Sequence, residues 1–182
     1  MPARSAAAKS YAKALFELAR ELDRVEPVAH ELERVRDLVA GNSALRSFLV
    51  RPWIGAGVKR KAVEAIAARL DVSKLSGDFF ALVAARGRTD LLDAMTDAYR
   101  SLVDEHMGRV RARVRTAVAL TDEERRILAG RLSRALDGKT VLLEEVVDPG
   151  LLGGFVAEIG SLIVDGSLDG QLARMRDRLA RA

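Results

Sequence analysis

The spacing of apolar residues changes once along this chain, near Gly108. From Ser5 to about Asp104, apolar residues recur every three or four positions, which is the spacing on the buried face of a helix. After Gly108 they alternate with polar residues, as they do on a half-buried strand. We therefore expect a mostly α fold, with an N-terminal six-helix bundle over residues 1–106 and a small C-terminal α+β domain over residues 107–182.

Turn and capping signals divide the first part into six expected helices. The residue before a proline avoids the helical region, so Glu26-Pro27 is expected to end the first helix, and Asn42 can cap the third. The six expected ranges are about 5–26, 28–41, 43–50, 57–70, 75–87 and 89–106. Because the connections are short, these helices are expected to pack as antiparallel neighbours.

The second part has signals for strands as well as helices. The expected strands are 109–118, 140–147 and 154–164. Thr121 and Glu124 have the spacing of a capping box, which predicts a helix through Leu136. A last helix is expected from about Ser167, with an apolar stripe formed by Leu168, Leu172, Met175 and Leu179.

No pattern in the chain indicates catalysis, a cofactor or a metal. The chain has no cysteine, and its two histidines, His30 and His106, are far apart in sequence, so the usual metal ligands are missing. The glycines of 150–154 are not followed by the Lys-Ser/Thr of a phosphate-binding loop. No apolar run approaches the roughly 20 residues of a membrane helix, so no direct membrane insertion is expected. We predict a non-enzymatic protein without a cofactor.

A net charge of +4 raises the alternative of a nucleic-acid partner. The charge is evenly divided, since residues 1–107 have 17 basic and 15 acidic residues and residues 108–182 have 13 and 11. The sharpest basic feature is a row of arginines in the first strand, Arg109, Arg111, Arg113 and Arg115. Such a row is more often a solvated strand face or a guarded sheet edge. No nucleic-acid partner is therefore predicted, and a basic RNA- or ribosome-associated α/β binding protein is the alternative.

The first and fifth helices are apolar over more than one packing face. In the first, the apolar arc that includes Tyr11, Ala14 and Leu15 spans roughly 200°. In the fifth, residues 79–85 are apolar in almost every direction. Two interpretations remain open, a central core helix or one wall of a groove that binds an amphipathic helix of a partner.

Several motifs together resemble the delta subunit of F-type ATP synthases, whose mitochondrial counterpart is the oligomycin-sensitivity-conferring protein. Residues 147–154, Val-Asp-Pro-Gly-Leu-Leu-Gly-Gly, followed by Gly160 and by Asp-Gly-Ser at 165–167, are similar to the family signature. Residues 11–16, Tyr-Ala-Lys-Ala-Leu-Phe, resemble the family's opening, and Gly-Arg at 87–88 lies where the family has Gly-Arg between its fifth and sixth helices. The resemblance covers nearly the whole chain in order.

The resemblance implies a non-catalytic stator connector, present in one copy per complex and peripheral on the cytoplasmic face of the bacterial plasma membrane. In the family, the N-terminal bundle binds the N-terminal segments of the alpha subunits at the catalytic head. The C-terminal domain binds the b subunits of the peripheral stalk. Tethered in this way, the head does not turn with the rotor, and ion-driven rotation is coupled to ATP synthesis.

The resemblance also implies positions for both binding surfaces. The alpha-subunit groove corresponds to Tyr11, Ala14, Leu15, Phe79 and Val83, so Val83→Asp is expected to release the alpha segment. The stalk-binding surface is assigned to the last helix, at residues that could equally belong to the core, Leu172, Met175 and Leu179.

The signature residues are expected to shape turns and a helix cap rather than to do chemistry. They are Asp148, Pro149, Gly153, Gly154, Asp165, Gly166 and Ser167. Proline fixes a turn, glycine permits backbone angles or close approaches that a Cβ forbids, and Asp-Gly-Ser can lead into a helix. Gly154→Val is therefore predicted to destabilise the C-terminal domain by more than about 1 kcal/mol.

Overall fold

The chain folds into two compact units, residues 1–103 and residues 104–182. The computed structural model describes the backbone of residues 2–160 and 162–179 and the side chains of residues 5–160 and 162–176. The division falls within the last turn of the last helix of the first unit, slightly before the expected boundary at 106/107. Within the described range, none of the helices is long and apolar enough to cross a membrane.

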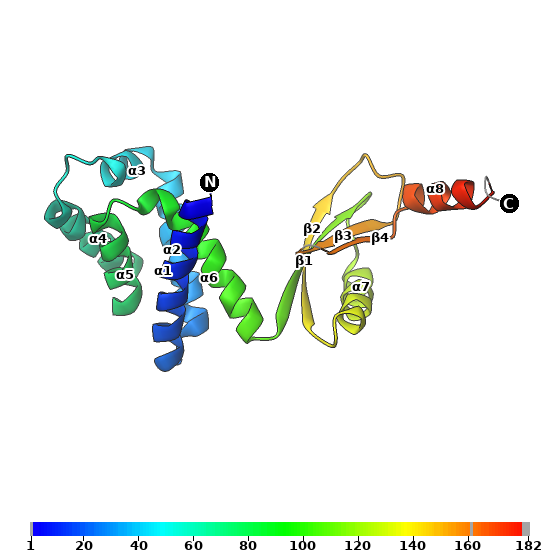
Figure 1. Ribbon diagram of the computed structural model, residues 1–182, viewed down its shortest axis with the longest axis horizontal. Coiled ribbons are helices and arrows are strands. Elements are labelled where there is room, and N and C mark those ends of the chain that lie inside the picture. The colour runs from blue at the N-terminus through cyan, green and yellow to red at the C-terminus, as the bar shows by residue number, and fades with distance from the viewer. Residues whose placement is uncertain (1, 161, 180–182) are drawn as a thin grey trace. The chain divides into compact units, whose positions relative to one another are not determined.

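The N-terminal unit is an α-helical bundle, as predicted (Figure 1). Its elements are α1 (Pro2–Glu21), α2 (Val25–Gly41), α3 (Ser43–Val50), α4 (Ala56–Leu70), α5 (Lys74–Ala85), the 3-10 turn η1 (Thr89–Leu91) and α6 (Leu92–His106). The expected end of the first helix at Glu26-Pro27 is wrong, because Pro27 lies in the first turn of α2. The first N–H groups of a helix have no intrahelical partner, so a proline is tolerated there.

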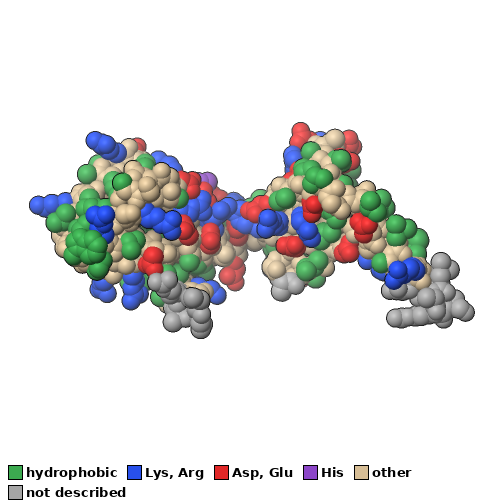
Figure 2. Space-filling model, turned by 90° about the horizontal axis from the view of Figure 1, so that it is seen from above, with side chains coloured by type: hydrophobic (Ala, Val, Ile, Leu, Met, Phe, Trp, Pro, Cys, Tyr) green, Lys and Arg blue, Asp and Glu red, His purple; other side chains and the backbone are tan. Residues whose placement is uncertain are grey.

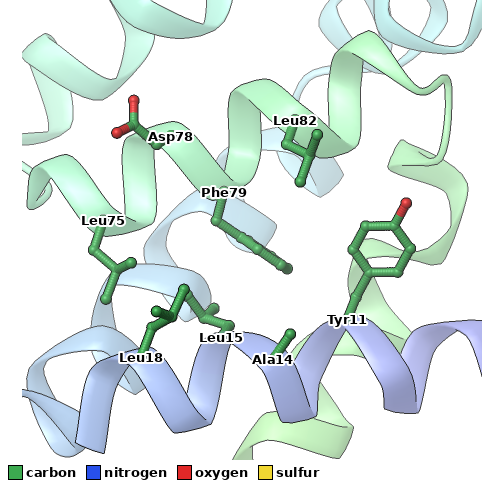
Figure 3. Close-up of a pocket in the computed structure, with 8 residues that line it drawn as sticks. All are labelled: Tyr11, Ala14, Leu15, Leu18, Leu75, Asp78, Phe79 and Leu82. Atoms are coloured by element: carbon green, nitrogen blue, oxygen red, sulfur yellow. The ribbon is translucent and has the colours of Figure 1, made fainter. Parts of the chain in front are cut away.

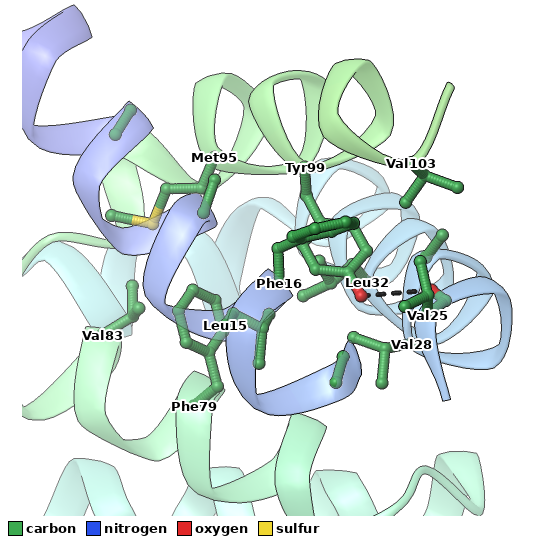
Figure 4. Packing of buried hydrophobic residues seen from close by; sticks show 14 of the residues in the cluster. Leu15, Phe16, Val25, Val28, Leu32, Phe79, Val83, Met95, Tyr99 and Val103 are labelled. Atoms are coloured by element: carbon green, nitrogen blue, oxygen red, sulfur yellow. Dashed lines mark hydrogen bonds between the residues drawn. The ribbon is translucent and has the colours of Figure 1, made fainter. Parts of the chain in front are cut away.

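Two clusters of buried apolar side chains hold this bundle together. The first joins α1, α2, α5 and α6, and the second joins α2, α3, α4, α5 and α6. In the first, Phe16 meets the ring of Tyr99 edge-on, with centroids 5.9 Å apart (Figure 4). The Tyr99 hydroxyl donates a 3.1 Å hydrogen bond to the carbonyl of Val25. This bond satisfies the polar end of a fully buried ring and fixes α6 on α2.

One buried carboxylate joins α2 to the start of α5. The hydroxyls of Ser73 and Ser76 each donate a 2.5 Å hydrogen bond to Glu31 Oε2, and Arg24 lies 3.6 Å from Oε1. Burial raises the pKa of Glu31, but the two hydroxyl hydrogen bonds outweigh it and leave the pKa below its ordinary value. Since Ser73 is also the N-cap of α5, this charged group fixes where α5 begins.

The C-terminal unit is built on a four-stranded sheet in the order β2-β1-β3-β4 (Figure 1). Its elements are β1 (Arg109–Thr116), α7 (Asp122–Ala135), β2 (Thr140–Val147), β3 (Phe155–Ile159), β4 (Leu162–Asp165) and α8 (Leu168–Leu179). β1 and β2 are parallel and joined through α7, whereas β3 is antiparallel to both β1 and β4. The single strand expected over 154–164 is wrong, because the chain reverses near Gly160, whose φ is +60°, and forms a hairpin.

One face of the sheet is covered by α7 and forms the core of the unit. The alternation expected for the first strand is confirmed, since Ala112 and Val114 are fully buried and pack with Leu128 and Leu132 of α7. The helix begins at the predicted capping box of Thr121 and Glu124, in which both reciprocal hydrogen bonds form.

The other face of β1 presents the row of arginines. Because β1 is an inner strand, the interpretation of a guarded sheet edge is wrong. Arg111 pairs with Asp104 and lies 3.1 Å from Glu144, and Arg115 lies 3.3 Å from Asp148. The solvated face is therefore occupied in part by ion pairs, which reduces its capacity to bind phosphate groups.

Candidate functional site

The N-terminal unit has an apolar hollow of about 230 Å³ between α1 and α5, which we call the α1–α5 hollow. Its lining residues are Tyr11, Ala14, Leu15, Leu18, Leu75, Asp78, Phe79 and Leu82 (Figure 3). The first four belong to α1 and the last four to α5, so the hollow lies where the two helices are side by side. An elongated apolar depression of this kind suits the apolar face of an amphipathic helix.

Aromatic rings form one end of the α1–α5 hollow. The rings of Tyr11 and Phe79 meet edge-on with centroids 6.4 Å apart, and both point into the hollow (Figure 3). The guanidinium of Arg88 lies 5.5 Å from the centroid of the Tyr11 ring. Arg88 belongs to the Gly-Arg pair after α5, so this pair positions a cation at the aromatic end of the hollow.

Four of the five predicted groove residues line the α1–α5 hollow, namely Tyr11, Ala14, Leu15 and Phe79. The fifth, Val83, does not line it. Its side chain is fully buried in the first apolar cluster, on the face of α5 that packs into the bundle. An aspartate at this position would lie in the core, so Val83→Asp is not a selective probe of the hollow.

The sequence interpretation missed the residues that form the rim. Leu18 and Leu82 are 49% and 45% exposed, and both line the hollow, whereas the carboxylate of Asp78 points away from it (Figure 3). The exposed apolar side chains on α1 were a usable signal, because Leu18 lies one turn after Leu15. In α5 the signal is weaker, since residues 79–85 are all apolar and none of them marks the solvent side.

A second apolar surface lies on α8, which extends away from the sheet of the C-terminal unit (Figure 1). Leu168, Leu172 and Met175 are each about half exposed or more and recur at helical spacing, and we call them the α8 stripe. Leu172 and Met175 are thus surface residues rather than core residues. The side chain of Leu179, the remaining residue assigned to stalk binding, lies outside the described part of the chain.

The signature glycines hold the start of α8 against the loop that precedes β3. Gly154 has φ +78°, and a Cβ there would lie 2.4 Å from the carbonyl oxygen of Gly166. A Cβ on Gly153 would lie 2.8 Å from Leu168, and one on Gly166 would lie 2.8 Å from the ring of Phe155. Gly154 requires glycine because the backbone of Gly166 and Ser167 passes within contact distance, whereas a Cβ at Gly153 or Gly166 would press on a neighbouring side chain.

Two aspartates of the signature organise the turns on either side of these glycines. Asp165 Oδ1 accepts hydrogen bonds from the Ser167 hydroxyl at 2.6 Å and from its backbone N–H at 2.9 Å, and these bonds lower the pKa of Asp165. Ser167 Oγ in turn accepts the N–H of Gly170 at 3.0 Å, so it caps α8. Asp148 accepts the N–H of Gly150 across Pro149. The signature residues therefore position α8.

Among the described residues, no group of three or more His, Cys, Asp and Glu side chains could hold a metal ion. The α1–α5 hollow is almost wholly apolar, and its one carboxylate, on Asp78, points outward. The two surfaces therefore fit the binding of other proteins rather than the transformation of a substrate.

Comparison with known proteins agrees with this interpretation. The family model described as ATP synthase delta (OSCP) subunit matches residues 7–179. An ATP synthase subunit delta of Anaeromyxobacter sp. (strain Fw109-5) is 44% identical over 94% of this chain and 96% of its own length. That of Beijerinckia indica is 36% identical over 93% of this chain and 89% of its own length.

Solved structures show the same fold at lower identity. A chain of the Toxoplasma gondii mitochondrial ATP synthase hexamer is 19% identical, with a TM-score of 0.71 over 95% of this chain and 97% of that chain. A chain of the Polytomella F-ATP synthase is 22% identical, with a TM-score of 0.51 over 54% of this chain and 87% of that chain.

Proposed function

Because the chain belongs to the ATP synthase delta (OSCP) subunit family, we propose that its two units bind different partners within that complex. Membership makes the chain a non-catalytic structural component of the peripheral stalk, which assembles with other ATP synthase subunits. The proposal is that the N-terminal unit binds the N-terminal segment of an alpha subunit, and that the C-terminal unit binds the b subunits.

The α1–α5 hollow is the observation that supports the first half of this proposal. Leu18 and Leu82 are large apolar side chains left about half exposed where they line the hollow, one on α1 and one on α5. A docked amphipathic helix would cover them and add apolar burial without rearranging the bundle. Buried aromatic and aliphatic anchors also tend to dominate binding energy, which suits a contact that resists torque.

The test is a calorimetric titration of the full chain with a peptide of roughly the first 25 residues of the cognate alpha subunit. We expect saturable one-to-one binding that changes little with salt, because apolar contacts are weakly screened. Leu82→Asp is expected to weaken binding at least tenfold, corresponding to about 1.4 kcal/mol. Ile127→Asp is the matched control, since Ile127 is similarly exposed but lies on α7.

Absence of binding to this peptide, or equal loss in both variants, would reject the hollow as the alpha-subunit site. Tight binding to RNA that falls roughly one log unit per neutralised phosphate for each tenfold rise in salt would instead favour the nucleic-acid alternative.

The α8 stripe supports the second half of the proposal. An amphipathic helix whose apolar residues face solvent is a surface that a helical stalk can cover. We expect Leu172→Asp with Met175→Asp to abolish pull-down of the b subunits while binding of the alpha peptide is unchanged. Retention of the b subunits by this variant would place their contact elsewhere on the unit.

Binding at both units would make the chain a stator connector on the cytoplasmic face of the bacterial inner membrane. The head would then be held against the torque of the rotor, so that ion flow is coupled to ATP synthesis. A complex containing the Leu82→Asp variant is expected to hydrolyse ATP while losing ion pumping, because an untethered head turns with the rotor.

A further inference from the structure

A third exposed apolar surface lies where α3 is joined to α4. Trp53, in the connecting loop, is 76% exposed, and Val50 at the end of α3 and Val58 at the start of α4 are 45% and 58% exposed. Hydrophobic side chains gather at this end of the N-terminal unit, with Lys and Arg side chains beside them (Figure 2). We call these three residues, with the basic residues around them, the α3–α4 corner. None of the three lines the α1–α5 hollow.

The charge around the corner is one-sided. Residues 43–61 contain five basic residues and no acidic residue, although the whole chain has a net charge of only +4. Arg60 pairs with Glu64 at 3.0 Å, and Lys59 is buried. The other three, Arg46, Arg51 and Lys61, are exposed and make no ion pair with any described residue. This local excess of positive charge contrasts with β1, where Arg111 and Arg115 have carboxylate partners.

The tryptophan ring has a cation beside it. The Arg51 guanidinium lies 5.7 Å from the centroid of the Trp53 ring, within the range of a cation–π contact. An exposed tryptophan paired with an arginine resembles the centre of a protein interface, where both residue types are enriched.

We propose that the α3–α4 corner is a separate docking surface whose occupant is an acidic amphipathic segment of another ATP synthase subunit. Charge complementarity selects an acidic partner, because the three exposed cations have no anion of their own. The aliphatic residues select an amphipathic peptide over RNA, since single-stranded nucleic acid binds mainly by stacking on several aromatic rings. The proposal requires membership of the complex, but not the assignment of the α1–α5 hollow.

Trp53 is itself a probe of this surface because it is the only tryptophan in the chain. The chain labelled with 5-fluorotryptophan gives one ¹⁹F resonance. The labelled chain is added to ATP synthase from which the native copy of this chain has been stripped. We expect the resonance to move and to lose its sensitivity to exchange of H₂O for D₂O, because the docked segment excludes solvent from the ring. A bound chain whose Trp53 resonance is unchanged would overturn the proposal.

Charge-reversal variants separate docking from other effects of assembly. Arg46→Glu with Lys61→Glu leaves the Arg51–Trp53 contact intact, and we expect this variant to lose the ¹⁹F change and to bind the stripped complex roughly tenfold more weakly at low salt. Arg69→Glu is the control, since Arg69 is an exposed cation in the last turn of α4. We expect it to behave like the parent chain, and an equal loss in this control would reject a specific corner.

Two further measurements distinguish a failure of this proposal from a failure of the function proposed above. Leu82→Asp alters the α1–α5 hollow and is expected to weaken overall binding, yet in the bound fraction the Trp53 resonance should still move. Movement of the resonance with poly(U) RNA or with phosphatidylglycerol vesicles, but not with the stripped complex, would overturn the proposal in favour of a different class of partner.

Discussion

The two units of the chain present candidate binding surfaces that are built in opposite ways. In the N-terminal unit, the α1–α5 hollow is a gap between two helices whose other faces form the core, so its shape depends on the packing of the bundle. In the C-terminal unit, the α8 stripe lies on a helix that extends from the sheet and is held mainly at its first turn. The first surface is preformed by core packing, whereas the second is positioned by turns.

The two units also differ in how polar groups stabilise them. The N-terminal unit uses a buried carboxylate, Glu31, with two hydroxyl donors to fix the start of α5. The C-terminal unit uses ion pairs on an exposed sheet face and backbone contacts at glycine. Disturbing the core should therefore damage the hollow, and disturbing a turn should damage the α8 stripe.

The largest effect is expected from Phe80→Ala. Phe80 is 1% exposed in the second apolar cluster, and truncation of a buried phenylalanine costs about 3–5 kcal/mol. The N-terminal unit should lose hydrogen-exchange protection while β1 keeps its own. Leu82→Ala is the control, because it truncates an exposed residue of the same helix. Equal loss of protection in β1 would show that the two units unfold together.

Glycine substitutions test the turns of the C-terminal unit. Gly154 and Gly138 both have φ +78°, but a Cβ at Gly138 meets no atom within 4 Å, whereas one at Gly154 meets backbone. Gly138→Ala should therefore cost about 1 kcal/mol for backbone strain, and Gly154→Ala more than about 2 kcal/mol. Urea unfolding of both variants measures the difference. Similar costs would mean that the loop moves aside easily.

Acid should affect the buried carboxylate of the N-terminal unit. The pKa of Glu31 is lowered from its ordinary value of 4.5, so its stabilising contribution is full above that value and is lost as the pH falls through the folded-state pKa. Glu31→Gln should cost about 1–2 kcal/mol near neutral pH. The difference between parent and variant should shrink in urea titrations as the pH falls below 4.5 and through the lowered pKa of Glu31. A difference that does not change with pH would assign the cost to packing alone.

The smallest effect is expected on the exposed face of β1. Arg115→Gln breaks the exposed pairs with Asp148 and Glu158 and should destabilise the C-terminal unit by less than about 1 kcal/mol. Arg113→Gln changes an exposed arginine on the same strand and should cost less still. The gap between the two variants should narrow in high salt. A larger loss for Arg113→Gln than for Arg115→Gln would contradict the ion-pair assignment.

Local signals predicted most of the fold. Asn42, the capping box at Thr121 and the glycine after α6 each satisfy backbone groups at a helix end, so they mark boundaries without knowledge of the tertiary structure. The helix end predicted at Pro27 was wrong because proline is allowed in the first turn of a helix as well as after its end. The β3–β4 hairpin was missed because a single glycine can interrupt a strand or reverse it, and only strand pairing decides which.

The lining of the proposed binding surfaces was predicted in part. Tyr11 and Phe79 were found through the resemblance and through the excess of apolar residues on their helices. Val83 was misplaced because residues 79–85 of α5 are apolar in almost every direction, and which of their faces is buried depends on where α1 and α6 pack. The order of the strands likewise depends on contacts between residues far apart in sequence, so neither feature could be derived from local spacing.

The strand directions have a mechanical consequence. β1 and β4 run in the same direction, because each is antiparallel to β3. A pull applied at the first residue of β1 and at the end of β4, where α8 begins, is therefore directed along the strands and loads the hydrogen bonds between them in shear. Bonds loaded in shear share the force and must break together, whereas bonds that are unzipped break one at a time. The C-terminal unit is oriented to withstand tension along the chain.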